Sequence, residues 1–364
     1  MAQLIALKIH ATTATTRAAG GVRVSPLPEQ AGVGSAAGED ASEDAALRDS
    51  FLCHASSHLL LHEEGAHETL LGFKAVRVGD AKRPPSFDDL LEALGREGSD
   101  KGQGNRQQPS SFVLELPHRE LGGACTSAED VKKMAELVKE RGIAFHCDGA
   151  RLWEAQPFYG ETFADLCSSF DSVYVSFYKG LGGMTGAMLV GSGAFVAEAR
   201  VWLRRFGGNV YTSLPYSVSC LHAFRSQIGT FGDRWNKLRR VTSLIGALEG
   251  VIAPGGGTSD SNASPPPPPR VRFQPAELEC CMVHCYIRGS QIELDRARDA
   301  VLAETGVKVF NRLRGVDGEG FNGRPGECYF EWNLGPVNGS VEDRVFVDAW
   351  EAFLGKLGQH SESC

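Results

Sequence analysis

The sequence has no run of about 18 consecutive apolar residues, the length that an α-helix needs to cross a bilayer. It also has no excess of basic residues, because 45 Asp and Glu outnumber 37 Lys and Arg and give a formal net charge of −8. Membranes and nucleic acids are therefore not expected as partners, since binding to them depends on a basic face. With 42% hydrophobic residues over 364 positions, the chain can form a large core.

No secretory signal peptide is recognised, and this guides the interpretation of the ten cysteines. Most of them stand in apolar, strand-like or helix-like segments. We therefore expect reduced, mostly buried thiols and a cytoplasmic protein, with import into an organelle as the alternative. Cys281 and Cys285 flank His284, but the second ligand pair of a typical zinc site is missing, so no metal site is predicted.

The first eleven residues, MAQLIALKIHA, allow two interpretations. Leu4, Ile5 and Ile9 can share one face of a helix that packs inside a domain. Alternatively, basic and Thr-rich sequence without an acid before Glu29 is typical of an organelle transit peptide.

Three segments lack apolar periodicity and are rich in Gly, Ser, Pro or polar residues, namely residues 19–47, 97–110 and 251–269. Such compositions cannot bury a core, so the first two are predicted to be insertions. The third ends in five prolines and is predicted to be a linker or insertion. It separates a large domain over residues 1–250 from a small C-terminal domain over residues 270–358.

Between these segments, apolar strand patterns alternate with a helical pattern. Strands are predicted at residues 112–116, 143–147, 172–177 and 186–190, and a helix is predicted to begin at Ser127. This alternation predicts an α/β fold with a mainly parallel sheet. In such sheets, ligands bind beyond the carboxyl ends of the strands.

Asp148 and Lys179 both follow predicted strands at that edge, within the segments HCDGAR and SFYKGLGG. A lysine amine can form a Schiff base with a carbonyl, and the glycines after it permit close approach of a ligand. A carboxylate can keep a pyridine nitrogen protonated, which pyridoxal phosphate requires to accept electrons. The alternative for each residue alone is a helix N-cap for Asp148 and a solvated cation for Lys179.

Together, the two segments resemble the threonine aldolase and aromatic amino acid β-eliminating lyase family, which are pyridoxal-phosphate enzymes of fold type I. HCDGARLWEA at residues 146–155 is similar to the family motif H-x-D-G-A-R, and YVSFYKGLGG at residues 174–183 is similar to S-x-S-K-G-L-G. The resemblance covers about residues 1–250. It implies an aspartate aminotransferase-like large domain, a small α+β domain, and a homodimer or homotetramer with sites at the interface.

The resemblance also implies roles for five residues. Lys179 would hold pyridoxal phosphate covalently, Asp148 would pair with its pyridine nitrogen, and Arg151 would contact its phenolic oxygen or the substrate carboxylate. His58, in the segment HLLLHEE, matches the family histidine that stacks on the cofactor ring and serves in proton transfer. A packed or surface histidine is the alternative for His58. Ser176 would help to line the cofactor site.

Two departures from the family put the substrate in question. The family segment E-N-T-H-N is replaced by ELPHR at residues 115–119, where Arg119 is either an anion contact or a surface residue. The family arginine for the substrate carboxylate, in an R-x-V-T-H context, has no counterpart here. Arg312, Arg314 and Arg324 lie nearby in the sequence without matching that motif.

Residues 1–3 are similar to part of the family's phosphate-binding turn, S-G-T-M-A-N-Q, which favours the helix interpretation of the N-terminus. The chain is therefore expected to lack the family's N-terminal part. The expected function is pyridoxal-phosphate-dependent cleavage of threonine- or allo-threonine-like β-hydroxy-α-amino acids to glycine and an aldehyde. The alternatives are another amino-acid β-eliminating lyase, which the departures favour, and a truncated, inactive family member.

Overall fold

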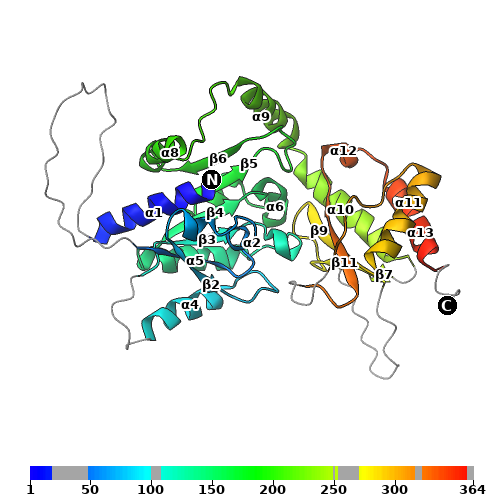
Figure 1. Ribbon diagram of the computed structural model, residues 1–364, viewed down its shortest axis with the longest axis horizontal. Helices are drawn as coiled ribbons and strands as arrows, with labels where there is room; N and C mark the ends of the chain where they lie inside the picture. The colour runs from blue at the N-terminus through cyan, green and yellow to red at the C-terminus, as the bar shows by residue number, and fades with distance from the viewer. Residues whose placement is uncertain (19–47, 100–107, 249–250, 253–269, 316–321, 359–364) are drawn as a thin grey trace.

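A computed structural model gives the structure of this protein. The residues that it describes are 1–18, 48–99, 108–248, 251–252, 270–315 and 322–358. The predicted insertion at 19–47 and most of the segments 97–110 and 251–269 lie outside the described residues. Figure 1 shows two lobes side by side, a larger one that begins with the N-terminus and a smaller one that contains the C-terminal helix.

The larger lobe is built around a six-stranded sheet with the order β2-β1-β3-β4-β5-β6. The strands are β1 (Ser50–His54), β2 (Lys74–Val78), β3 (Ser111–Glu115), β4 (Ala144–Gly149), β5 (Ser172–Ser176) and β6 (Ala187–Gly191). The first five pair in parallel, and β6 runs antiparallel to β5. Strands β3 and β5 are buried along their whole length, as expected for a sheet covered on both faces. The predicted α/β fold with a mainly parallel sheet is confirmed.

Helices of this lobe cover the sheet. They are α1 (Ala2–Ala18), α2 (His58–Leu61), α3 (Ala66–Thr69), α4 (Phe87–Ser99), η1 (Arg119–Leu121), α5 (Ala128–Glu140), α6 (Leu152–Tyr159), α7 (Phe163–Cys167), α8 (Gly193–Arg205) and α9 (Leu214–Gln227). The hydroxyl of Ser127 accepts the N–H of Asp130 and caps α5, as predicted. In α1, Leu7 packs against Phe51, and Ile5 packs in a cluster with Phe195 of α8. The N-terminal residues therefore form a buried helix of the larger lobe.

The smaller lobe contains a second sheet with the order β10-β11-β9-β8-β7. Its elements are α10 (Phe231–Gly246), β7 (Val251–Ile252), β8 (Val271–Gln274), β9 (Met282–Arg288), α11 (Gln291–Thr305), β10 (Arg314–Gly315), β11 (Glu327–Asn333), α12 (Pro336–Gly339) and α13 (Asp343–Gly358). Its core centres on Trp332 and Trp350, and α10 contributes Leu238 and Ile245 to it. This arrangement confirms a smaller C-terminal α+β part, while the boundaries at 250 and 270 remain predictions.

Some features do not occur among the described residues. No helix there is both long and apolar enough to cross a membrane. The nine described cysteines are all free thiols, seven of them buried. No group of three or more His, Cys, Asp or Glu side chains in the described part of the chain could hold a metal ion.

Two glycines let the loop after β3 pack closely against the smaller lobe. Gly122 has a φ of +71°, and a Cβ at this position would overlap the carbonyl oxygen of Gln274. Gly123 has a φ of +88°, and a Cβ there would overlap the thiol of Cys280. The loop that carries Arg119 is thereby held against the second sheet.

Gly122→Ala is expected to lower the free energy of unfolding by at least about 2 kcal/mol, because it adds both backbone strain and an overlap with backbone. Chemical denaturation followed by circular dichroism measures this. Gly142→Ala is the matched control, since Gly142 has a φ of +62° but open space around its Cβ position. Equal losses for both variants would show that close packing at Gly122 contributes nothing.

Candidate active site

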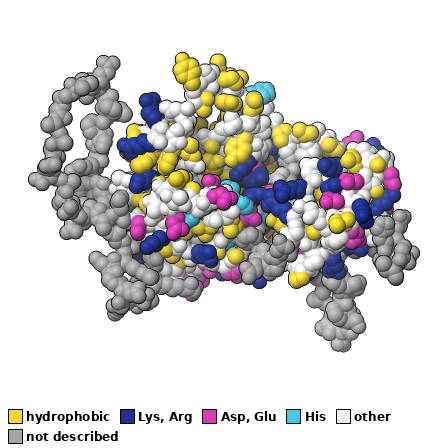
Figure 2. Space-filling view, in the orientation of Figure 1, with side chains coloured by type: hydrophobic (Ala, Val, Ile, Leu, Met, Phe, Trp, Pro, Cys, Tyr) yellow, Lys and Arg dark blue, Asp and Glu magenta, His cyan; other side chains and the backbone are white. Residues whose placement is uncertain are grey.

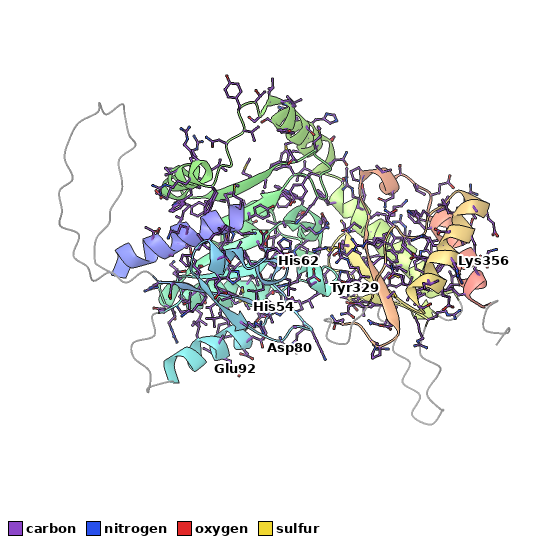
Figure 3. The ribbon with its side chains drawn as sticks, viewed as in Figure 1. His54, His62, Asp80, Glu92, Tyr329 and Lys356 are labelled. Carbon is purple, nitrogen blue, oxygen red and sulfur yellow. The ribbon has the colours of Figure 1, made fainter. Side chains whose placement is uncertain are left out.

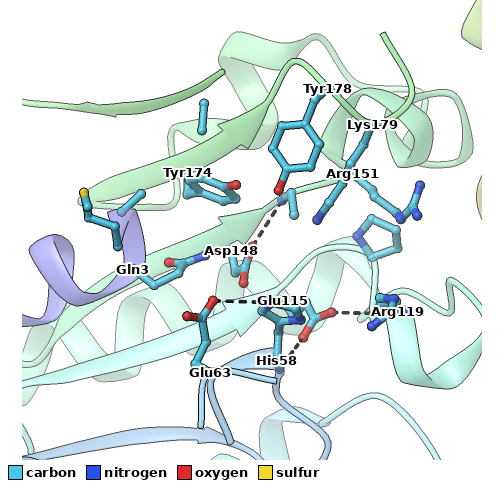
Figure 4. A pocket seen from close by; sticks show the side chains of 15 residues that line it. Gln3, His58, Glu63, Glu115, Arg119, Asp148, Arg151, Tyr174, Tyr178 and Lys179 are labelled. Atoms are coloured by element: carbon cyan, nitrogen blue, oxygen red, sulfur yellow. Dashed lines mark hydrogen bonds and ion pairs between the residues drawn. The ribbon is translucent and has the colours of Figure 1, made fainter. Parts of the chain in front are cut away.

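A cavity of about 240 Å³ lies at the carboxyl edge of β3 and β4. Lys179, Asp148, Arg151 and His58 all line it, so the structure brings together four of the five predicted site residues (Figure 4). Ser176, the fifth, is buried at the end of β5 and is not part of the lining. Its hydroxyl donates to the carbonyl oxygen of Ala150, which holds the turn after β4.

Asp148 and Lys179 reach the cavity because the parallel strands that carry them end at the same edge. Asp148 is only 3% exposed, and its carboxylate accepts the N–H of Ala150 over 3.2 Å. Burial raises the pKa of Asp148, and the positive charges of Lys179 and His58 oppose that shift. A further cationic or N–H donor beside this carboxylate would therefore stabilise its ionised form.

Glu115 is a buried carboxyl that the sequence analysis did not identify as functional. One oxygen accepts the N–H of His58 over 3.2 Å and the other accepts the N–H of Arg119 over 2.9 Å. Burial and the nearby charge of Asp148 raise the pKa of Glu115 to about 7. Glu115 thus ties two segments of the cavity wall together. The available signal was its position, because it lies next to the end of the predicted strand 112–116, and in the structure it pairs in register with Asp148.

His58 begins the short helix α2, whose buried Leu59 anchors it to the core. Its Nε2 lies 3.4 Å from Oε1 of Glu63, and its ring centroid lies 5.0 Å from that of His62. Hydrogen bonding to Glu63 raises the pKa of His58 despite partial burial. The imidazole therefore faces the cavity with a carboxylate that stabilises its protonated form (Figure 4).

Arg151 lines the cavity through a guanidinium that is fixed by a carboxylate. Its Nη1 donates to both oxygens of Glu154 over 3.1 Å. Its Nε is buried and has no hydrogen-bond partner within the described part of the chain. This arrangement leaves the buried Nε–H of Arg151 available to a ligand group.

Arg119 lines the cavity, and its guanidinium is paired with two carboxylates. Its Nε lies 2.8 Å from Oε1 of Glu331 on β11, and its Nη1 lies 3.1 Å from Oε1 of Glu120. Arg314 of β10 also approaches Glu331, at 3.6 Å. Figure 3 labels His62 and Tyr329, which lie on the two sides of this junction. The smaller lobe therefore supplies a carboxylate and a second arginine beside the cavity.

The residues present fit pyridoxal phosphate. The amine of Lys179, the buried carboxylate of Asp148 and the imidazole of His58 line one cavity. These three groups suit the carbonyl, the pyridine nitrogen and the ring face of pyridoxal phosphate, respectively. The unpartnered Nε of Arg151 is a buried donor for an oxygen of the ligand. Ala2, the first residue of α1, and the preceding Met1 also line the cavity, and a helix N-terminus favours an anionic group.

Comparison with known proteins places the chain in a family. Residues 34–259 match the family model of the beta-eliminating lyases, which is more than half of the chain. The chain belongs to the beta-eliminating lyase family, and the resemblance inferred from HCDGAR and SFYKGLGG is confirmed.

Individual relatives agree with this assignment. Over 163 residues the chain is 36% identical to Aldolase vrtJ of Penicillium aethiopicum, covering 44% of this chain and 40% of that protein. It is 32% identical over 176 residues to the low-specificity L-threonine aldolase of Candida albicans, covering 48% and 46%. The chain thus spans less than half the length of these two curated relatives. A crystal structure of a candidate L-allo-threonine aldolase from Listeria monocytogenes EGD-E superposes with a TM-score of 0.74 at 27% identity, covering 98% of this chain and 79% of that one.

Proposed function

We propose that this protein is a pyridoxal-phosphate-dependent carbon–carbon lyase that cleaves threonine- or allo-threonine-like β-hydroxy-α-amino acids to glycine and an aldehyde. The observation that carries the proposal is the convergence of Lys179, Asp148 and His58 on one cavity at the carboxyl edge of the sheet. The threonine aldolases among the relatives support the choice of substrate class.

Each of the cavity residues has a different role in the proposed reaction. When bound, pyridoxal phosphate supplies an electron sink for the charge left on the substrate α-carbon as a bond there breaks. Lys179 provides the amine that holds the cofactor. Asp148 is suited to keep a proton on the pyridine nitrogen, because its carboxylate is buried and gains from a positively charged neighbour. Arg151 offers its free Nε–H to an oxygen of the ligand.

His58 is the candidate base for the β-hydroxyl proton, directly or through a water molecule. Loss of this proton lets the Cα–Cβ bond break and the β-carbon leave as an aldehyde. The substrate carboxylate is assigned to Arg119, with Arg314 close to it through Glu331. Arginine suits this task because its planar guanidinium binds a carboxylate through two parallel hydrogen bonds.

The role of Arg119 leads to a prediction about substrate affinity. Arg119→Gln is expected to raise KM for the amino acid by about 10- to 100-fold and to change kcat less, because a charge-assisted contact to the substrate is lost. Steady-state kinetics measures both constants. Arg272→Gln is the matched control, since Arg272 forms a similarly buried pair with Glu327 away from the cavity. An unchanged KM for Arg119→Gln would contradict the assignment.

The pairing of Glu63 with His58 predicts a change in pH dependence. A base must be deprotonated, so activity should rise with pH through the raised pKa of His58. Glu63→Gln removes the main cause of that raised pKa, although Glu115, Asp148 and Lys179 still act on the imidazole. The acid limb of the kcat/KM profile should therefore move to lower pH by up to about 1 unit. Glu129→Gln, a remote surface substitution, should leave the profile unchanged.

A second candidate function is elimination at the β-carbon of another amino acid. The observation that favours it is the replacement of the family's Asn-Thr by Leu116-Pro117, with Pro117 in the cavity wall. Product analysis separates the two functions. Cleavage of threonine or allo-threonine gives glycine and acetaldehyde in equal amounts, whereas β-elimination gives a keto acid and ammonia. Formation of the second pair from an amino acid, without glycine, would replace the first proposal.

We further propose a homodimer or homotetramer in the cytoplasm, with organelle import as the alternative. An apolar face over β6, α8 and α9 supports the oligomer, because monomers rarely expose large apolar patches (Figure 2). Its exposed side chains are Met188, Val190, Val201, Leu203, Tyr211, Leu214, Val218 and Leu221. Analytical ultracentrifugation measures the oligomeric state.

The free thiols of the described cysteines support the proposed cytoplasmic location, because thiols stay reduced in a reducing compartment.

A further inference from the structure

A series of buried hydrogen bonds begins at Gln3 in the cavity wall, crosses from β4 to β5, and ends at His10, farther along α1. Oε1 of Gln3 lies 2.6 Å from Nε2 of His146, and Nδ1 of His146 lies 2.7 Å from Oγ of Ser172. The same hydroxyl lies 2.7 Å from Nε2 of His10. All four side chains are at most 6% exposed. These hydrogen bonds join strands β4 and β5 to two positions on α1, Gln3 and His10.

The spacing of Gln3 and His10 explains why α1 contributes two side chains to this series of hydrogen bonds. They are seven residues apart, so they project from the same face of the helix two turns apart. His146 and Ser172 are direct partners in the parallel pairing of β4 and β5. The hydrogen bonds therefore fix the first turn of α1, and with it the N-terminus of the helix, beside the cavity.

The chemistry of the four groups gives these hydrogen bonds a direction. Burial and the neighbouring His10 lower the pKa of His146 to about 3, so its imidazole is neutral and carries one N–H. The carbonyl oxygen of Gln3 can only accept, which places that N–H on Nε2. Nδ1 is then bare and accepts the hydroxyl proton of Ser172, whose oxygen accepts the N–H of His10.

This direction leaves the amide nitrogen of Gln3 facing the cavity. Gln3 belongs to the cavity lining, and Figure 4 shows its amide end pointing toward Asp148. Its Nε2 is buried and has no hydrogen-bond partner among the residues that the structure describes. A buried donor without a partner destabilises the site, and a ligand that accepts its hydrogen bond would remove that penalty.

We propose that Gln3 is a ligand-binding residue of this site, whose Nε2–H donates to an anionic oxygen of pyridoxal phosphate. His146, Ser172 and His10 are positioning residues that hold the carboxamide with its donor toward the cavity. The proposal rests on the proposed function, since it takes the cofactor to be the ligand. It adds a contact from the first turn of α1 to the roles of Lys179 and Asp148.

Equilibrium binding of pyridoxal phosphate tests the role of Gln3. Gln3→Glu replaces the donor by a negative oxygen, so binding should weaken by at least about tenfold, while Gln156→Glu on α6, outside the cavity, should have no effect. A loss seen with pyridoxal phosphate alone assigns the contact to the phosphate. A loss that extends to pyridoxal assigns it to the ring oxygen. Unchanged binding of both compounds would overturn the proposal.

Two measurements address the positioning residues without any assay of activity. Nitrogen NMR of the histidine side chains should show His146 with its proton on Nε2 and a bare Nδ1. Ser172→Ala should weaken cofactor binding by about three- to tenfold, and Ser172→Thr, which keeps the hydroxyl, should restore it. A proton on Nδ1 of His146, or full affinity in Ser172→Ala, would overturn the positioning role.

The experiments separate this proposal from the proposed function. If the unchanged chain binds no pyridoxal phosphate, the proposed function fails and Gln3 loses its ligand. If the unchanged chain and Gln3→Glu bind it equally well, only the role of Gln3 fails. Thermal unfolding of each variant shows whether the fold is retained, and His146 NMR tests the hydrogen-bond chain in the unchanged protein.

Discussion

Lys179→Ala is expected to lower kcat/KM for the β-hydroxy amino acid by on the order of 10³-fold or more. Lys179 is the one lysine among the described residues that line the cavity, so no neighbouring amine can replace it. The loss should appear mainly in kcat, because the residue acts on the cofactor rather than on substrate binding. Release of glycine and of the aldehyde, followed over time, measures the effect.

The control for this variant is Lys237→Ala. Lys237 pairs with Asp343 in the smaller lobe, so its removal changes charge and side-chain volume in the same way outside the cavity. Lys237→Ala should retain activity within about twofold of the unchanged chain. Comparable activity of Lys179→Ala and Lys237→Ala would contradict the proposed role of Lys179.

Asp148→Asn is expected to lower kcat by on the order of 10²- to 10³-fold while leaving the fold intact. An amide cannot balance a positive charge on the pyridine nitrogen, so the cofactor becomes a weaker electron sink. Stability should not fall at neutral pH. The pKa of Asp148 is raised in the folded state, so its ionised form opposes folding above the unfolded pKa, and asparagine removes that cost.

Activity and unfolding measured on the same samples separate these two effects. Glu327→Gln serves as the control because Glu327 is a buried carboxylate paired with Arg272 away from the cavity. It should lose stability and keep kcat, which is the opposite of the result for Asp148→Asn. A large loss of stability in Asp148→Asn with full activity per folded molecule would contradict the assignment.

The sequence predicted the part of the site that depends on strand ends. Asp148 and Lys179 each follow an apolar strand, and parallel strands place their carboxyl ends at one edge. That rule is enough to bring Asp148 and Lys179 together. Local rules also predicted the cap of α5, because Ser127 and Asp130 are three residues apart.

The rest of the site depends on contacts between distant segments. Arg119 meets Glu331 across more than 200 residues, and Gln3 meets His146 across 143. No periodicity or short motif encodes such pairs, since they arise from the packing of the two lobes and of α1 on the sheet. Arg314 illustrates the same limit, because only the pairing of β10 with β11 brings it to Glu331.

The most direct test of this account is to locate the lysine that binds pyridoxal phosphate. The chain is incubated with the cofactor, reduced with borohydride, digested and analysed by peptide mass spectrometry. The account predicts one dominant cofactor adduct on the peptide that contains Lys179, and its loss in Lys179→Ala. An adduct on other lysines with none on Lys179, or no adduct at all, would contradict it.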